Sequence, residues 1–387
     1  MPRRSRKNWI LAGLILVNAV LLGPIALAVI GYGVGAAGFF PGLLMAAVPV
    51  PFYVAFALWV DRFESEPSWL LAVTFIWGAA IAVFFSLLFN WVGSGIFAVL
   101  AGDASASTYT AVLVAPLVEE LTKGAALILL FAWKRDEFDN VTDGIVYASM
   151  VGLGFAMTEN VQYYGQAVAE HTGATGVFVL RGIMGPFSHP LFTSMTGIGL
   201  GLARESDKRW VKNVAPLIGI SVAILLHSIW NLAATFGAVF IAAYFLVMVP
   251  AFAGVGAIVI FSLRREANLI RTHLESVVAE GVLGREDVLV VTSVSRRLGA
   301  SARALFTGGF GRWAARRRFH ALATDLAFHS WRVSREADED ARAIHAELVA
   351  DILAVRARLG LAREIHPPEP ELVRRLTRET PLPVTSM

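Results

Sequence analysis

The 387-residue chain contains no cysteine, which excludes disulfide bonds, thiolate metal ligands and a cysteine nucleophile. Any metal ion that it binds has to be held by His, Asp or Glu side chains. Charged residues are also scarce, at 16% of the chain, whereas hydrophobic residues make up 56% and the mean hydropathy is +0.62. This composition excludes an ordinary soluble domain and indicates a membrane protein.

The apolar residues are gathered in eight runs, each long enough to cross a hydrocarbon core of about 30 Å. We therefore predict an all-α fold: a polytopic bundle of about eight transmembrane helices with a cytoplasmic helical tail. The first run is either a cleaved signal peptide or, as its length favours, an uncleaved helix. The predicted segments are Trp9 to Ile30, Phe39 to Val60, Trp69 to Leu100, Tyr109 to Trp133, Gly144 to Gly165, Val177 to Ala203, Val214 to Phe236 and Ala238 to Leu263.

Two predicted connections, 101–108 and 166–176, have no Lys or Arg. Because basic residues are retained on the cytoplasmic side, these two loops are expected outside and both chain termini inside the cell. Only Lys123 and Arg181 fall within spans, and Arg181 is close enough to the outer end of its helix to snorkel. The alternate connections carry Arg62, Lys134, Arg135, Arg204, Lys208, Arg209, Lys212, Arg264 and Arg265.

The chain divides by composition into three parts. We predict a transmembrane domain over 1–263, a cytoplasmic helical region over 264–366 and a Pro-rich disordered terminus over 367–387. From Arg264 onward the chain holds 20 of its 33 basic residues, all of them arginine. Arg316 to Arg318, beside Trp313 and Phe319, either rest on anionic lipid or form a solvated helix face.

The segment around Glu119, Glu120 and Lys123 places two acids and one base inside an apolar run. An ionisable group in the bilayer costs at least about 2.5 kcal/mol on insertion scales, so three within five residues require partners. The i, i+3 and i, i+4 spacing allows the lysine to lie between both carboxylates on one helix face. A purely structural interpretation is a helix-stabilising ion pair, but such a pair needs only one acid.

Four more polar residues lie within predicted spans: Glu159, His189, His227 and Asn231. A single intramembrane histidine is often a satisfied core residue, and His227 with Asn231 could be interhelical hydrogen-bonding partners. Together with the acid pair, however, these residues come from four consecutive helices at similar predicted depths. We interpret them as one polar site in the outer half of the membrane.

The chemistry open to this set is narrow because water is the plausible nucleophile. Water requires a general base and a stabiliser of developing charge. Histidines and acids that converge from different helices either bind Zn²⁺ or donate hydrogen bonds to an oxyanion. Three competing signatures are missing: there is no H-E-x-x-H, no G-x-G-D, and Trp91-Val92-Gly93-Ser94-Gly95 lacks the glycine of a rhomboid-type G-x-S-G.

The ordered motifs E-E-x-x-K, F-x-x-x-E, a single intramembrane His and H-x-x-x-N resemble the PrsW family of intramembrane proteases, within the CAAX prenyl endopeptidase and bacteriocin-processing superfamily. The acidic turn from Asp61 to Pro67 is similar to another hallmark of that family. The resemblance covers about Asp61 to Asn231 and does not extend to the tail. It implies Glu119 as the water-activating base, with Glu120 and Lys123 beside it, and Asn231 as an oxyanion donor.

The resemblance leaves two mechanisms open. PrsW proteins are classed as metalloproteases, whereas related CAAX enzymes have also been described as metal-independent glutamate proteases. We expect Glu159, His189 and His227 to hold Zn²⁺, because two histidines and a spare acid exceed what a lone carboxylate mechanism requires.

The family implies regulated cleavage of membrane-anchored proteins, such as anti-sigma factors, in the bacterial plasma membrane. We expect such a substrate and the lipid bilayer as partners, and no nucleic acid. Two other functions fit the same residues: a secondary transporter with a proton or cation relay, and a non-catalytic membrane receptor.

Overall fold

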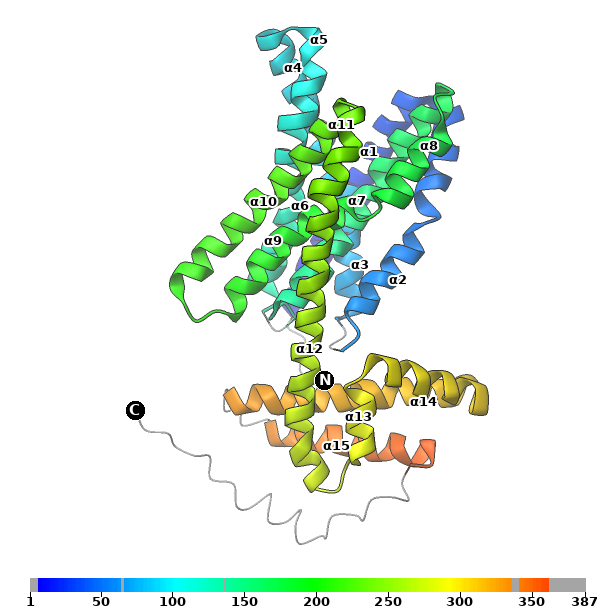
Figure 1. Cartoon of the computed structure of the whole chain (residues 1–387), viewed down its shortest axis with the longest axis vertical. Helices are drawn as coiled ribbons and strands as arrows, with labels where there is room; N and C mark the ends of the chain where they lie inside the picture. Colours follow the sequence, from blue (N-terminus) through cyan, green and yellow to red (C-terminus); the bar gives the residue numbers. More distant parts are fainter. Residues whose placement is uncertain (1–5, 64–65, 136, 336–340, 362–387) are drawn as a thin grey trace. The chain divides into compact units, whose positions relative to one another are not determined.

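The computed structural model describes residues 6–63, 66–135, 137–335 and 341–361. Within these residues the chain is all-helical and contains no strand (Figure 1), as predicted. Four short π-helical turns, named η, interrupt the α-helices. The elements are α1 (Arg6–Ala47), α2 (Val50–Val60), α3 (Ser68–Ile76), η1 (Trp77–Ala82), α4 (Val83–Ala101), α5 (Asp103–Tyr109), η2 (Thr110–Val114), α6 (Ala115–Trp133), α7 (Val141–Ala169), α8 (Ala174–Phe178), η3 (Val179–Met184), α9 (Ser188–Glu205), α10 (Arg209–Thr235), α11 (Ala238–Ala243), η4 (Tyr244–Met248), α12 (Val249–Ala279), α13 (Arg285–Val291), α14 (Val294–Arg335) and α15 (Ala341–Leu359).

The chain forms two compact units. The membrane unit comprises the described residues up to 62 and those from 66 to 260, and the tail unit comprises those from 261 onward with residue 63. This division falls near the domain boundary predicted after Leu263. The predicted Pro-rich terminus, 367–387, lies outside the described residues.

Five helical segments of the described chain are long and apolar enough to cross a membrane, so the predicted count of eight is not confirmed. They are Leu11–Val60, Ser68–Ala101, Val141–Ala169, Arg209–Thr235 and Val239–Ala279. The first contains two predicted spans, which adjoin through a kink at Gly35 (φ 68°). The prediction of a continuous span over 177–203 is wrong, because the chain leaves the helix between η3 and α9.

Helix α7 is the centre of the membrane unit, and 20 of its 29 residues are buried. It packs along α1, α9 and η1. Small residues permit this close approach: Gly144 of α7 faces Gly197 of α9, and Gly154 faces the backbone of Phe75. The close contact between α7 and α9 therefore fixes the distance between the side chains that project from these two helices.

A methyl group at Gly197 should disrupt this packing, because the new Cβ would overlap the carbonyl group of Gly144. We expect Gly197→Ala to lower the free energy of unfolding by about 1–3 kcal/mol through overpacking. Thermal unfolding of the purified protein in detergent measures the effect. Gly254→Ala on α12 is the matched control, since among the described residues no atom beyond its own stretch of helix lies within 4 Å of its Cβ position. Equal stability of the two variants would contradict the close contact.

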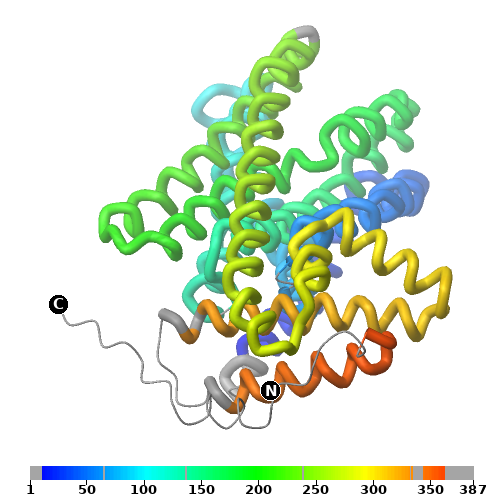
Figure 2. The backbone as a smooth tube through the Cα atoms, turned by 60° about the horizontal axis from the view of Figure 1, so that its bottom comes forward, coloured from blue at the N-terminus to red at the C-terminus, as the bar shows by residue number. Residues whose placement is uncertain are grey.

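The tail unit is built on α14 and α15, which pack together around buried apolar residues, among them Phe319, Leu326 and Ile352. Gly309 has a positive φ of 68° and divides α14 into two helices. The chain turns back at this point, as the yellow and orange parts of Figure 2 show. Only glycine adopts this conformation readily, so the turn depends on its missing side chain.

Candidate active site

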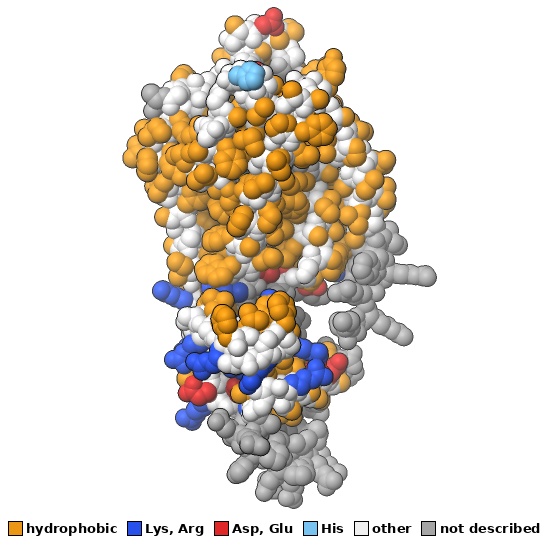
Figure 3. Space-filling model, turned by 90° about the vertical axis from the view of Figure 1, so that its right-hand side faces the viewer, with side chains coloured by type: hydrophobic (Ala, Val, Ile, Leu, Met, Phe, Trp, Pro, Cys, Tyr) orange, Lys and Arg blue, Asp and Glu red, His pale blue; other side chains and the backbone are white. Residues whose placement is uncertain are grey.

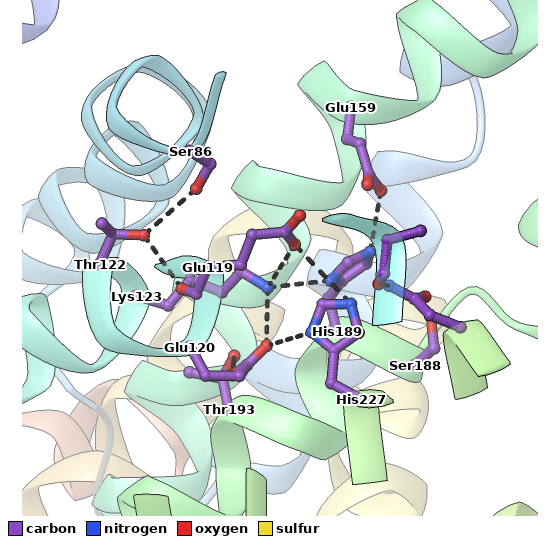
Figure 4. A network of polar contacts seen from close by, with 12 residues as sticks. Ser86, Glu119, Glu120, Thr122, Lys123, Glu159, Ser188, His189, Thr193 and His227 are labelled. Atoms are coloured by element: carbon purple, nitrogen blue, oxygen red, sulfur yellow. Dashed lines mark hydrogen bonds and ion pairs between the residues drawn. The ribbon is translucent and has the colours of Figure 1, made fainter. Parts of the chain in front are cut away.

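The predicted polar residues on α6, α7, α9 and α10 converge in the membrane unit (Figure 4). Glu119, Glu120 and Lys123 project from one face of α6, and their exposed fractions are 4%, 0% and 0%. Two contacts at Thr122 hold α6 in place. The Trp77 indole N–H donates to the carbonyl of Thr122 at 3.0 Å, and the Thr122 hydroxyl lies 3.4 Å from the Ser86 hydroxyl. The acids and the lysine are therefore held toward α9 and α10.

Lys123 donates hydrogen bonds to three residues of the cluster. Its ammonium has three N–H donors and three acceptors around it: Glu120 Oε1 at 2.8 Å, His189 Nδ1 at 3.0 Å and Glu119 Oε2 at 3.4 Å. The ammonium also lies 4.0 Å from the centre of the Phe155 ring. Because the ammonium can only donate, Nδ1 of His189 accepts and the proton of a neutral ring resides on Nε2.

Glu120 holds His227 in a defined orientation. Its Oε1 lies 2.9 Å from His227 Nδ1, and its Oε2 accepts a hydrogen bond from the Thr193 hydroxyl at 3.0 Å. With Nδ1–H donating to Glu120, a neutral His227 presents an unprotonated Nε2 on its other side. That nitrogen lies 3.8 Å from Glu119 Oε2, too far for a hydrogen bond. Thr193 was not among the site residues predicted from sequence.

Glu159 contacts the opposite side of His189, with Oε2 at 2.9 Å from Nε2. The same oxygen forms an ion pair with Arg181, whose Nε donates to Asn160 Oδ1 at 2.6 Å. Arg181, predicted to lie close enough to the outer end of its helix to snorkel, is bound to an acid of the site, and its side chain is 20% exposed. The sequence contains one indication of this ion pair: Arg181 and Glu159 are oppositely charged residues within predicted spans.

Asn231 lies on α10 one turn beyond His227. Its side-chain amide donates to the carbonyl of Ala111 in η2 at 2.8 Å, which ties α10 to the segment that precedes α6. A π-helical turn leaves backbone carbonyls without their usual helical partners, so this contact has a structural reason. The second N–H of the amide is not used in that bond, and the oxyanion role stays a prediction.

Glu119, His189 and His227 could hold a metal ion, because one ligand atom from each lies within 4.8 Å of the others and all three are buried. Two imidazoles and one carboxylate match the ligands of catalytic zinc sites, and the Glu120 contact fixes the tautomer that leaves His227 Nε2 free to coordinate. The donor set thus fits a divalent cation. Glu159 was predicted from sequence to belong to this group. In the structure Glu119 occupies that place, and Glu159 contacts His189 and Arg181.

The acidic turn forms a second polar cluster, at the start of α7. The amide N–H of Glu66 donates to Asp61 Oδ2 at 2.8 Å, and the Tyr147 hydroxyl donates to the Glu66 carboxyl. Burial, reinforced by Asp143, raises the pKa of Glu66 to about 12, so this carboxyl is protonated at neutral pH. Asp143 of this cluster and Glu159 of the candidate active site lie roughly 24 Å apart along α7 at 1.5 Å per residue. The two clusters are therefore distinct.

The sequence of the chain is similar to those of known proteases. Residues 66–255 match the family described as PrsW family intramembrane metalloprotease. The protein named Protease PrsW from Oceanobacillus iheyensis is 30% identical over 172 residues, which cover 43% of this chain and 71% of that protein. The chain belongs to the PrsW family of intramembrane metalloproteases. A second Protease PrsW, from Bacillus subtilis, is 27% identical over 208 residues, 52% of this chain and 82% of that protein.

PrsW membership establishes the chain as an intramembrane protease and supports neither a transporter nor a receptor. Another relative, Protease PrsW from Geobacillus kaustophilus, is 33% identical over 153 residues, 38% of this chain and 60% of that protein. No solved structure matches the chain. The PrsW match contains every residue of the polar cluster and ends at residue 255, before the tail unit.

Proposed function

We propose that this PrsW protease hydrolyses a peptide bond of a membrane-anchored protein with Glu119 as the residue that deprotonates the attacking water. The observation that carries this proposal is the difference between the two neighbouring acids. Among the described residues Glu120 accepts hydrogen bonds from Lys123, His227 and Thr193, whereas Glu119 accepts one long bond from Lys123. Glu119 therefore keeps more of its lone pairs for a water molecule than Glu120 does.

The surrounding residues prepare Glu119 for this role. Lys123 compensates its negative charge without a short hydrogen bond, so the carboxylate stays available to accept a proton. Glu120 orients His227, and Glu159 with Arg181 orients His189. After deprotonating the water, Glu119 is placed to return the proton to the leaving amine.

We further propose that His189, His227 and one carboxylate oxygen of Glu119 hold Zn²⁺, which leaves the second oxygen of Glu119 to accept the proton of the water. A metal ion there would supply Lewis-acid polarisation of the scissile carbonyl and of water. The His227 tautomer supports this assignment, since its bare Nε2 is suited to coordination and cannot donate to an oxyanion. His189 is engaged at both nitrogens, so coordination through Nδ1 requires Lys123 to withdraw.

The metal proposal predicts that purified active protein contains about one zinc per chain and that chelation abolishes cleavage. His227→Ala and His189→Ala should each lose metal together with activity, because a site with about three protein ligands does not tolerate removal of one. Elemental analysis beside a cleavage assay measures both properties. Full activity without stoichiometric metal would refute the metal assignment and leave Glu119 as a metal-independent base.

We place the protein in the bacterial plasma membrane with both termini cytoplasmic and the site in the outer half. This placement is supported by the two connections without Lys or Arg and by the bacterial origin of the relatives. The resemblance to PrsW proteases suggests an anti-sigma factor as the substrate. The substrate class follows from the burial of the site among membrane-spanning helices.

The function is tested by comparing membrane proteomes of cells that carry the wild-type chain or Glu119→Gln. We expect a full-length membrane-anchored protein to accumulate with Glu119→Gln and its shortened form to disappear. Glu170→Gln, at an exposed position outside the site, is the control and should resemble wild type. Identical proteomes under conditions in which the protein is expressed would contradict a proteolytic role for Glu119.

A further inference from the structure

The tail unit contains a cavity of ≈ 340 Å³ where the two halves of α14 meet the end of α15. Four arginines line it: Arg296 and Arg303 from the first half of α14, and Arg312 and Arg316 from the second half. Among the described residues that line the cavity there is no Asp or Glu. The turn at Gly309 brings these two pairs of guanidinium groups to one place.

Asp287, the acid that acts on Arg316 electrostatically, is already paired with another arginine. Asp287 forms an ion pair with Arg356, a neighbouring arginine that is 4% exposed. Burial lowers the pKa of Arg316; Asp287 opposes this shift, whereas Arg356, Arg312 and Arg303 add to it. Like charges gathered in this way destabilise a fold unless an anion lies among them.

Arg316 supplies an independent observation. Its Nη1 atom is fully buried and has no hydrogen-bond partner among the described residues. An unsatisfied buried donor on a charged group is costly, and such groups are normally paired. The guanidinium group presents its donors as a fork that matches phosphate oxygens in pairs. A phosphate in the cavity would satisfy Nη1 and neutralise the surrounding charge at once.

We propose that this arginine cavity binds a phosphate group carried by a lipid headgroup or by a soluble compound. Its volume lies at the lower end of known ligand sites, which suits a phosphate with a small attached group. Phe306 and Phe310, on either side of the Gly309 turn, are 87% and 74% exposed. Figure 3 shows Lys and Arg side chains beside hydrophobic ones on one face of this unit, the combination that anionic lipid recognises.

The experiment uses the full chain in phosphatidylcholine nanodiscs and isothermal titration with two probes, inorganic pyrophosphate and short-chain phosphatidylglycerol. At least one probe should bind with one-to-one stoichiometry. Arg316→Gln and Arg303→Gln, from opposite halves of α14, should each weaken binding about tenfold or more, because each removes a charge-assisted hydrogen bond. Arg271→Gln is the matched control: it makes the same charge change at an exposed position on α12.

The two probes distinguish the sources of the phosphate. Binding of pyrophosphate alone identifies a soluble phosphate compound, and binding of phosphatidylglycerol identifies a lipid headgroup. Absence of binding by both probes overturns the proposal. Equal weakening by Arg271→Gln also overturns it, because diffuse surface charge would then explain the binding. If Arg316→Gln does not fold, Arg303→Gln on the more exposed side of the cavity decides the result.

Discussion

Replacement of Glu119 by glutamine should lower the rate of substrate cleavage by about 10²- to 10⁴-fold, the range that general-base catalysis supplies. Glutamine has the size of glutamate and can still accept a hydrogen bond from Lys123, so the cluster keeps its packing. It cannot take a proton from water. Single-turnover cleavage of the accumulated substrate by the purified chain measures the loss, and an unchanged melting temperature shows that folding is intact.

Glu170→Gln is the matched control for this experiment. Glu170 is an exposed acid at the end of α7, and its described contact is with Gln166 at 2.8 Å. We expect it to cleave at the wild-type rate. If Glu119→Gln were as active as this control, the base would have to be another residue, and Glu159 would be the next candidate.

Replacement of Lys123 by methionine should lower the free energy of unfolding by about 3–5 kcal/mol, because it leaves buried charge without its partner. Methionine fills a similar volume but removes the donor to Glu119, Glu120 and His189 at once. The two carboxylates would then face each other in a water-poor site. Denaturant unfolding in mixed micelles measures the effect, and Lys212→Met, at an exposed position on α10, should change stability little.

A second variant identifies the cause of the Lys123→Met effect. If unpaired charge is responsible, Lys123→Met combined with Glu119→Gln should be more stable than Lys123→Met alone, since one of the two carboxylates is neutralised. If the double variant is less stable than the single one, lost packing around the lysine stem would be the cause. Unchanged stability in Lys123→Met would show that Glu119 and Glu120 are not both charged.

The convergence of the polar residues could be predicted from sequence because polar groups are costly in a bilayer. Glu119, Glu120 and Lys123 need partners, and His189 and His227 occur at comparable depth on later spans. The structure places these five residues in one network. The contacts that complete it were missed, because hydrogen bonds such as that from Thr193 to Glu120 depend on helix rotation, which hydropathy does not reveal.

The number of spans was less predictable for a related reason. Hydropathy detects apolar runs, but it does not detect where a helix turns or breaks inside one. The irregular stretch between Met184 and Ser188 lies inside one predicted run, whereas the kink at Gly35 lies between two predicted runs. Conversely, α6 carries three charged side chains within 19 residues, so apolar content alone does not mark it as a spanning helix.

The break between η3 and α9 has a mechanical consequence. Arg181 lies before the break and His189 after it, and both contact the same oxygen of Glu159. The two half-helices are thus joined through a single side chain of α7 as well as through the chain itself. A sideways displacement of η3 by a passing polypeptide would pull on Glu159 and rotate the imidazole of His189. Glu159 therefore links the position of η3 to the orientation of the His189 ring.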